Sequence, residues 1–178
     1  MINMLKKVIA IIVIFTGIGH LASSQDIKNL QAINEVHQKF KEAFDSLDYE
    51  LFASIHSEKL IRIPGGKKII DYDTYVNKQK SNFEKAKSEN SPRTIYLRFF
   101  ERVNNDSVAS ERGIYKFVRN ENQHNEKISY GKFHVLLIKE EGDWKILMDY
   151  DSSEGKIINE EDFNKAYDMN DFEKFIKI

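Results

Sequence analysis

The sequence predicts an α+β fold in which helices come first and an antiparallel sheet follows. Between Asp26 and Leu47, apolar residues recur at three- and four-residue steps, which indicates a helix with one buried face. After Pro92 the pattern changes to strand-like stretches joined by two tight-turn sequences, residues 104–107 and residues 140–143. Helices followed by a four-stranded meander predict a layer of helices on one face of a sheet.

Three helices are expected before the sheet. A polar residue at the start of each can accept hydrogen bonds from the first backbone amides. A short strand over residues 60–63 separates the second helix from the third and stops at Pro64-Gly65-Gly66. The expected helices run for about six turns from Asp26 to Leu47, from Asp48 to about His56, and from Asp71 or Asp73 to about Ser91.

The strands are expected to form two hairpins. The first joins residues 94–103 to residues 108–118, and the second joins residues 128–139 to residues 144–151 and contains the only tryptophan, Trp144. A last helix is expected from Asn159 to Ile178. Asn159 is its predicted cap, and residues 160–162 are acidic, which suits the positive end of a helix dipole.

The first 24 residues have the pattern of a secretory signal peptide. Lys6 and Lys7 precede an apolar run over residues 8–22, which is shorter than the roughly 20 residues that a membrane span needs. Cleavage is expected after Ser24, leaving Gln25 as the new N-terminus. We therefore expect an exported protein, periplasmic or secreted, that is not held in a membrane after cleavage.

The composition of the remaining chain narrows the classes of function. Without Lys6 and Lys7, 25 basic and 28 acidic residues remain, with both signs interspersed, which gives no electrostatic footprint for nucleic acid. The chain has no cysteine, so disulfides are excluded. No histidine pair has a metal-ligand spacing and no nucleotide-binding glycine motif occurs, so neither a metal nor a cofactor is expected.

The order of elements, with LDYELFASIHSEKLIRIPGGKKI entering the sheet and EEGDWKI near its end, resembles the nuclear transport factor 2-like superfamily. The SnoaL-like and ketosteroid-isomerase-like branches look most similar, over residues 26–153. The resemblance implies a cone: three N-terminal helices on a strongly curved, mainly antiparallel sheet, enclosing an apolar pocket. It implies one domain over residues 25–158, followed by a C-terminal helical tail over residues 159–178. Members include enzymes and proteins that only bind ligands, so the fold does not fix a reaction.

The resemblance can be compared with steroid-type isomerisation one residue at a time. That chemistry needs an aspartate base, a tyrosine and a protonated aspartic acid, an arrangement that is itself a standard example of tuned carboxyl groups. The tyrosine position falls on Phe40, the base on Ile63 or Pro64, and the second aspartate on His134. None of these residues supplies the required group, so steroid-type isomerisation is rejected.

The second hairpin contains the main catalytic candidates. With Glu141-Gly142 as a two-residue turn, His134 is expected to face Asp149. His134 could then act as a general base oriented by Asp149; the alternative is a cross-strand ion pair, like that expected between Lys132 and Asp151. The face expected to line the pocket carries Tyr130, Lys132, His134, Leu136, Leu147, Asp149 and Asp151. The opposite face, with Trp144, is expected to be covered by a second subunit or by the C-terminal helix.

Further contacts with a ligand are expected from Phe40 and from the first hairpin. One face of that hairpin carries Tyr96, Arg98, Glu111 and Tyr115, a mixture that could line a ligand site. The alternative is ordinary packing of strand aromatics, with a structural salt bridge between Arg98 and Glu111.

Two main hypotheses of function follow. The first is a ligand-binding or accessory module for a small apolar molecule. The second is a hydrolase, dehydratase or isomerase of a small substrate with His134 as its base. A third hypothesis is that the protein forms a homodimer and serves only as an interaction module.

Overall fold

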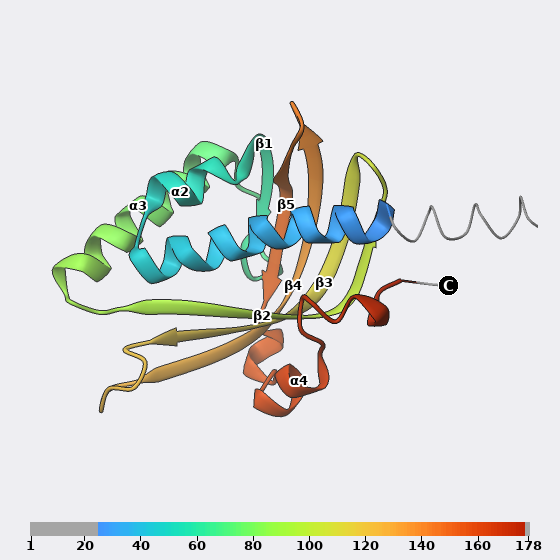
Figure 1. The fold of residues 1–178 in the computed structure, drawn as a ribbon. Coiled ribbons are helices and arrows are strands. Elements are labelled where there is room, and N and C mark those ends of the chain that lie inside the picture. Colours follow the sequence, from blue (N-terminus) through green and yellow to red (C-terminus); the bar gives the residue numbers. More distant parts are fainter. Residues whose placement is uncertain (1–24, 177–178) are drawn as a thin grey trace, which may run out of the picture.

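The computed structural model describes residues 25–176, so the predicted signal peptide and its cleavage site lie outside the described residues. Within this range no helix is long and apolar enough to span a membrane. The helices and strands, in chain order (Figure 1), are a helix over residues 25–46, α2 (Tyr49–Ser54), β1 (His56–Ile63), α3 (Tyr72–Ser88), β2 (Arg93–Asn104), β3 (Val108–Arg119), β4 (Lys127–Glu140), β5 (Asp143–Ser152) and α4 (Glu160–Lys165). Three short 3-10 turns, η1 (Pro64–Gly66), η2 (Glu154–Lys156) and η3 (Phe172–Lys174), complete the order.

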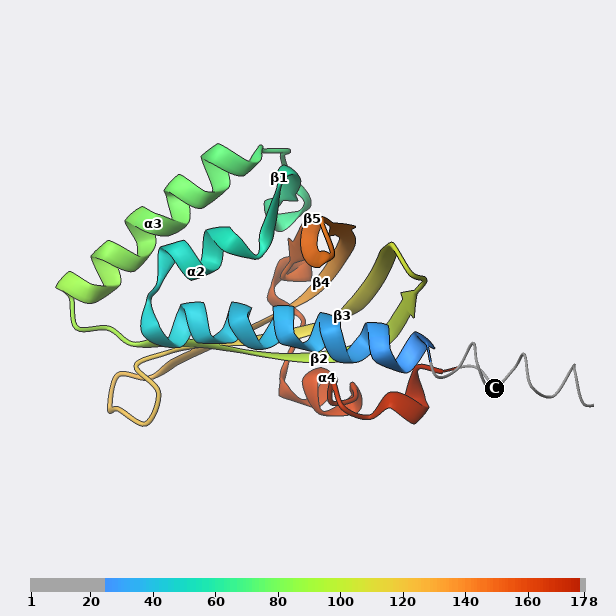
Figure 2. The ribbon, with the colours of Figure 1, turned by 45° about the horizontal axis from the view of Figure 1, so that its top comes forward.

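The predicted α+β class and the predicted helix starts agree with the structure in most places. The side chain of Asp48 accepts hydrogen bonds from the first amides of α2, and Asp71 does so at the start of α3. Asp26 lies inside the N-terminal helix and is not its cap. Figure 2 shows the N-terminal helix, α2 and α3 on one side of the sheet and α4 on the other.

The sheet has five strands in the order β1-β5-β4-β3-β2. Strands β2 to β5 form the predicted antiparallel meander, and β1 joins it parallel to β5. The predicted short strand over residues 60–63 is therefore the end of a longer strand that begins at His56.

The sheet is strongly bent, and bulges and glycines allow the bend. The register slips once between β2 and β3, beside Phe100, and once between β4 and β5. A Cβ atom on Gly113 would lie 2.0 Å from the carbonyl oxygen of Arg98, and one on Gly131 would lie 2.4 Å from the hydroxyl of Tyr115. Gly113 accepts only glycine, because a neighbouring backbone oxygen occupies the space of a side chain, and any side chain at residue 131 would require the ring of Tyr115 to move.

The helices cover the concave side of the bent sheet with two groups of buried apolar residues. The first group joins the N-terminal helix to β1, β4 and β5 through residues such as Ile33, Leu60 and Trp144. The second joins the N-terminal helix to α2 and α3 through residues such as Phe44, Phe52 and Phe83, whose rings pack edge to face. Between these groups the sheet and helices are not in full contact, and a cavity remains.

The tail is not the single long helix that the sequence predicts. Asn159 caps α4 with a capping box, as expected, but α4 ends at Lys165. Tyr167 then forms two backbone hydrogen bonds with Phe99, of 2.8 and 2.9 Å, on the outer edge of β2. The backbone of the tail therefore forms hydrogen bonds with the free edge of β2 instead of continuing the hydrogen bonds of a helix.

Candidate functional site

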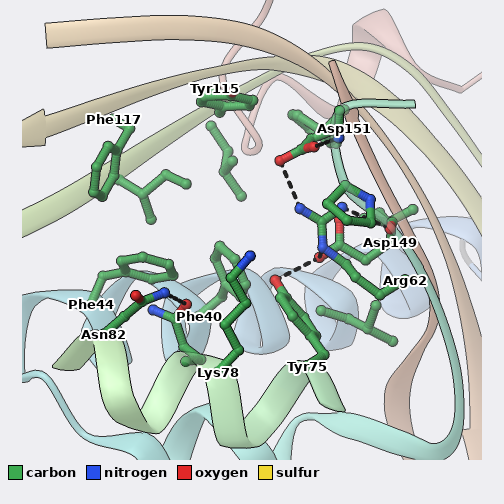
Figure 3. A pocket seen from close by; sticks show the side chains of 18 of the residues that line it. Phe40, Phe44, Arg62, Tyr75, Lys78, Asn82, Tyr115, Phe117, Asp149 and Asp151 are labelled. Carbon is green, nitrogen blue, oxygen red and sulfur yellow. Dashed lines mark hydrogen bonds and ion pairs between the residues drawn. The ribbon is translucent and has the colours of Figure 1, made fainter. Parts of the chain in front are cut away.

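The cavity lies between the concave face of the sheet, the N-terminal helix and α3, and has a volume of about 530 Å³ (Figure 3). Its walls are mostly apolar, with Phe40, Phe44, Leu97, Phe117 and Val135 among the lining residues. One end is polar, where Arg62, Tyr75, Asp149 and Asp151 point toward one another. A mainly apolar cavity with a few convergent polar groups is the usual form of a small-molecule site.

Arg62 connects the polar groups at this end. Its guanidinium donates a 2.7 Å hydrogen bond to Oδ2 of Asp151 and a 3.0 Å hydrogen bond to the backbone oxygen of Asp149. Its Nε lies 3.5 Å from Oδ2 of Asp149, the same oxygen that accepts a 3.0 Å hydrogen bond from the hydroxyl of Tyr75. The backbone amide of Gly65 donates to the other oxygen of Asp151. We call Arg62, Tyr75, Asp149 and Asp151 the open cluster.

The pairing of β1 with β5 explains how this cluster forms. Arg62 pairs directly with Asp149, and Asp151 follows two residues later on the same face of β5. Tyr75 comes from the first turn of α3, whose start is fixed by the Asp71 cap. Four polar groups from three separate elements therefore converge without any short sequence motif.

Burial changes the acid–base properties of the open cluster. It raises the pKa of the Asp149 carboxyl, although the charge of Arg62 and the hydrogen bond from Tyr75 act in the opposite direction. Burial, and then the negative charge of Asp149, raise the pKa of Tyr75 well above its usual value. The carboxyl of Asp149 is thus easier to protonate than an ordinary surface aspartate.

A β-bulge in β5 gives the second hairpin a different register from the predicted one. Glu140 and Asp143 pair beside the turn, as predicted. Further along, two consecutive residues of β4 pair with Ile146 and Met148, so Leu147 has no partner in β4. One extra residue moves every later side chain of β5 to the other face.

The predicted pair of His134 and Asp149 is therefore wrong. His134 pairs with Tyr150, and Asp149 pairs with Val135. A 3.0 Å hydrogen bond joins Nε2 of His134 to the hydroxyl of Ser110, on the convex side of the sheet. His134 and Asp149 lie on opposite faces, so Asp149 cannot orient His134 as a base.

The same bulge places apolar and acidic residues of β5 on one face. Trp144 and Ile146 precede the bulge and Asp149 and Asp151 follow it, and all four point to the concave side. Trp144 is only 5% exposed and lies in the core of its own chain. The Trp144 face is therefore covered within its own chain. The alternation of side chains along the strand instead suggests that a second subunit or the C-terminal helix covers it.

Of the other predicted contact residues, Phe40 and Tyr115 line the cavity. Tyr96 and Arg98 line a separate groove of about 390 Å³ beside β2.

Lys132 lines a groove on the convex face with His134 and pairs with Ser152, so its predicted pairing with Asp151 is also wrong. Three more predicted contacts lie away from the cavity: Tyr130 packs against Phe163 of α4, Leu136 lies opposite Met148, and Leu147 is the bulged residue.

Glu111 is fully buried, with a different partner from the one predicted. Its Oε1 accepts a 2.7 Å hydrogen bond from Nε of Arg102, and its Oε2 is bonded to Nε2 of His37. Arg102 pairs directly with Glu111 on the turn side of the bulge beside Phe100, whereas Arg98 lies beyond the bulge and pairs with Ile114. We call His37, Arg102 and Glu111 the sealed cluster.

A second buried histidine, His56, lies near the open cluster. Its Nδ1 is 2.6 Å from the backbone oxygen of Phe52, and its ring packs against those of Phe52 and Tyr75. Burial lowers the pKa of His56 to about 4, and the charge of Arg62 acts in the same direction. His56 is therefore a neutral packing residue at pH 7.

Sequence reasoning missed Arg62, Tyr75 and His37 as residues of the cavity. Their partners lie more than seventy residues away in sequence, so no local spacing could identify them. Among residues 25–176 no group of three or more histidine, aspartate or glutamate side chains could hold a metal ion.

No family model and no curated protein matches this sequence. Solved structures match it well in shape. An NTF-2 like protein of unknown function from Shewanella oneidensis MR-1 has 20% identity and a TM-score of 0.56, over 68% of this chain and 97% of that one. An NTF2-like protein of unknown function from Pseudomonas putida KT2440 has 8% identity and a TM-score of 0.60, over 71% and 87%.

The protein Aln2 from a Streptomyces species has 8% identity and a TM-score of 0.64, over 73% of this chain and 94% of Aln2. Identities this low show the fold alone. The chain therefore has the nuclear transport factor 2-like fold, and the prediction from sequence is confirmed at that level. The matches do not single out the SnoaL-like branch.

Proposed function

We propose that this protein binds a small, mainly apolar molecule in the cavity, with one polar group of that molecule against the open cluster. The observation that supports this most directly is a cavity of about 530 Å³ with apolar walls and buried, convergent polar groups at one end. This volume lies within the usual range of small-molecule sites.

The open cluster offers a ligand both donors and acceptors. The side chain of Asp151 is 30% exposed although its oxygens bond to Arg62 and Gly65, so it has capacity for one more hydrogen bond. Lys78 points from α3 into the cavity in Figure 3 and adds a positive charge near the same end. A hydroxyl or a carbonyl on the ligand would find a partner here.

A cavity-filling substitution tests this proposal. The probe is 2-naphthol, which is apolar except for one hydroxyl and is fluorescent. We expect the wild-type protein to bind 2-naphthol and Leu97→Trp, which places a larger ring in the cavity, to bind it at least about tenfold more weakly. Val103→Trp is the matched control, because Val103 is 58% exposed outside the cavity. Equal binding by Leu97→Trp and the wild type would contradict the proposal.

A second candidate function is acid–base catalysis in the same cavity. The raised pKa of Asp149, beside the more exposed carboxyl of Asp151, favours it, because paired carboxyl groups in different environments can move a proton. The test uses NMR to measure the rate at which the acidic CH protons of 2-tetralone exchange with deuterated buffer. We expect the wild type to accelerate exchange and Asp149→Asn to lose that acceleration while it still binds 2-naphthol. No acceleration by the wild type would leave binding as the function.

The proposal also includes export. The basic start and the apolar run over residues 8–22 support it. Expression of the full chain in a bacterium, followed by N-terminal sequencing of the periplasmic or secreted protein, should find Gln25 at the start. An uncleaved protein in the cytoplasm would contradict export without affecting the binding proposal.

A further inference from the structure

We propose that His37 forms a second hydrogen-bonding position in the same cavity, so that the ligand carries a second hydroxyl. This inference rests on the proposed binding function. His37 is only 2% exposed, yet it lines both the cavity and the neighbouring groove beside β2. It is therefore buried from bulk water and accessible from the internal space.

The sealed cluster holds the His37 ring in one orientation. Glu111 is 0% exposed and bonds to His37 through one oxygen and to Arg102 through the other. Arg102 is in turn fixed by a 2.7 Å hydrogen bond to the backbone oxygen of Met169 and by packing over the ring of Phe99. His37, Glu111 and Arg102 are all buried, so the ring cannot turn without breaking a charged hydrogen bond.

The charge of Glu111 determines the protonation of the His37 nitrogen that contacts it. Burial raises the pKa of Glu111, but the charges of His37 and Arg102 and their hydrogen bonds lower it further, so that it lies below its usual value. An ionised carboxylate only accepts hydrogen bonds, so Nε2 of His37 must carry a proton. The lone pair of the neutral imidazole is then on Nδ1, where it can accept a hydrogen bond from an O–H group, and a charged ring would instead donate from Nδ1 to the oxygen of the same group.

His56 shows what a purely structural histidine looks like in this protein. Its Nδ1 is bonded to the helix backbone at Phe52, and its Nε2 is sealed without a partner among residues 25–176. Nδ1 of His37, by contrast, has no hydrogen bond among the described residues and is not one of their sealed polar atoms. A ring that is held firmly at one nitrogen and is open at the other is suited to bind a ligand.

Two naphthols test this inference. The first, 2-naphthol, has one hydroxyl, and 2,6-dihydroxynaphthalene has a second hydroxyl at the far end of the same ring system. We expect the wild type to bind the diol about fivefold more tightly, which is the typical effect of one added hydrogen bond. His37→Gln keeps a donor toward Glu111 but has no nitrogen at the position of Nδ1, so it should bind both compounds equally. His134→Gln, on the convex face, should keep the preference.

The nitrogen NMR signals of His37 supply a second measurement that a structural role alone would not change. On the wild-type protein, the Nδ1 signal should shift when the diol is added and stay in place with 2-naphthol. This result decides the question even if His37→Gln does not fold. An unshifted Nδ1 signal with equal affinities for both compounds would overturn the role of His37 alone. Failure of the wild type to bind either compound would overturn this inference and the binding proposal together.

Discussion

The open cluster and the sealed cluster use the same groups for different purposes. In each, an arginine is paired with a carboxylate of the neighbouring strand and lies over an aromatic ring, Arg62 at 5.0 Å from Tyr75 and Arg102 at 4.6 Å from Phe99. They differ in access to water: the side chain of Asp151 is 30% exposed and that of Glu111 is 0% exposed.

This difference separates a binding group from a supporting one. A charge that is fully removed from water must be balanced by partners inside the protein, so the sealed cluster is fixed and costly to disturb. A partly exposed carboxylate keeps some of its hydration and can exchange a water molecule for a ligand atom. We therefore expect substitutions in the sealed cluster to affect folding and substitutions in the open cluster to affect binding.

The largest expected effect is that of Glu111→Ala. This substitution leaves Arg102 buried without its carboxylate partner, and we expect it to lower the free energy of unfolding by about 3–5 kcal/mol. Urea denaturation measures the change. Asp151→Ala is the matched control in the open cluster, where Arg62 keeps Asp149 as a partner and the loss should be clearly smaller. Equal losses in the two variants would remove the distinction between the clusters.

The next effect depends on pH and tests His56, beside the open cluster. Because the folded pKa of about 4 lies below the unfolded value of 6.5, the unfolded state binds a proton first as the pH falls. His56 therefore lowers stability progressively from pH 6.5 to pH 4, by about 3 kcal/mol at the lower end.

The variant His56→Phe keeps a ring at this position and removes the titrating group. Its unfolding free energy relative to the wild type should improve by that amount between pH 7 and pH 4, as measured by urea denaturation across this range. His134→Phe serves as a comparison, because His134 is only partly buried and its pKa, lowered mainly by burial, should contribute less. A difference between wild type and His56→Phe that does not change with pH would contradict this account.

The sequence predicts the fold better than the site, and the two bulges explain most of the gap. Hydrophobic periodicity locates the helices, and the turn residues locate both hairpins, because these signals are local. Alternation then assigns strand faces correctly only up to a bulge. One extra residue at Leu147 puts Asp149 and Asp151 on the face of Trp144 instead of the face of His134. The slip beside Phe100 puts Arg98 on the face opposite Arg102, so Arg98 cannot be the partner of Glu111.

A histidine held by a carboxylate does occur in this protein, although not between the two residues predicted. Such a pair exists between His37 and Glu111, which are 74 residues apart in sequence. His37 belongs to the apolar stripe of the N-terminal helix, and only the packing of that helix on β3 brings it to Glu111. Contacts of this kind depend on tertiary structure and cannot be predicted from the spacing of residues in the sequence.

A smaller effect is expected where the tail covers the sealed cluster. The ring of Phe175 lies 5.5 Å from the guanidinium of Arg102 and packs against Phe99. Phe175→Ala should lower the unfolding free energy by about 1–2 kcal/mol, through lost ring contacts and a weaker cation–π interaction. Ile157→Ala is the control, because Ile157 is 72% exposed. An equally small change in both variants would mean that the tail does not support the sealed cluster.

The smallest expected change in stability tests the open cluster itself. Tyr75→Phe removes one hydrogen bond to Asp149 and should lower the unfolding free energy by about 1 kcal/mol at pH 7. Because that hydrogen bond lowers the pKa of Asp149, its loss should raise the pKa further. A raised folded pKa favours the folded state at lower pH, so the stability loss should shrink as the pH falls.

Carbon NMR of the Asp149 carboxyl measures this pKa directly, and Tyr115→Phe provides the control. Tyr115 also lines the cavity, but its hydroxyl has no hydrogen bond among residues 25–176, so the titration of Asp149 should be unchanged. A higher pKa in Tyr75→Phe alone would assign Tyr75 a specific role in setting the charge of Asp149. The same titration in all three proteins would instead mean that burial and Arg62 determine this charge, and that Tyr75 contributes packing only.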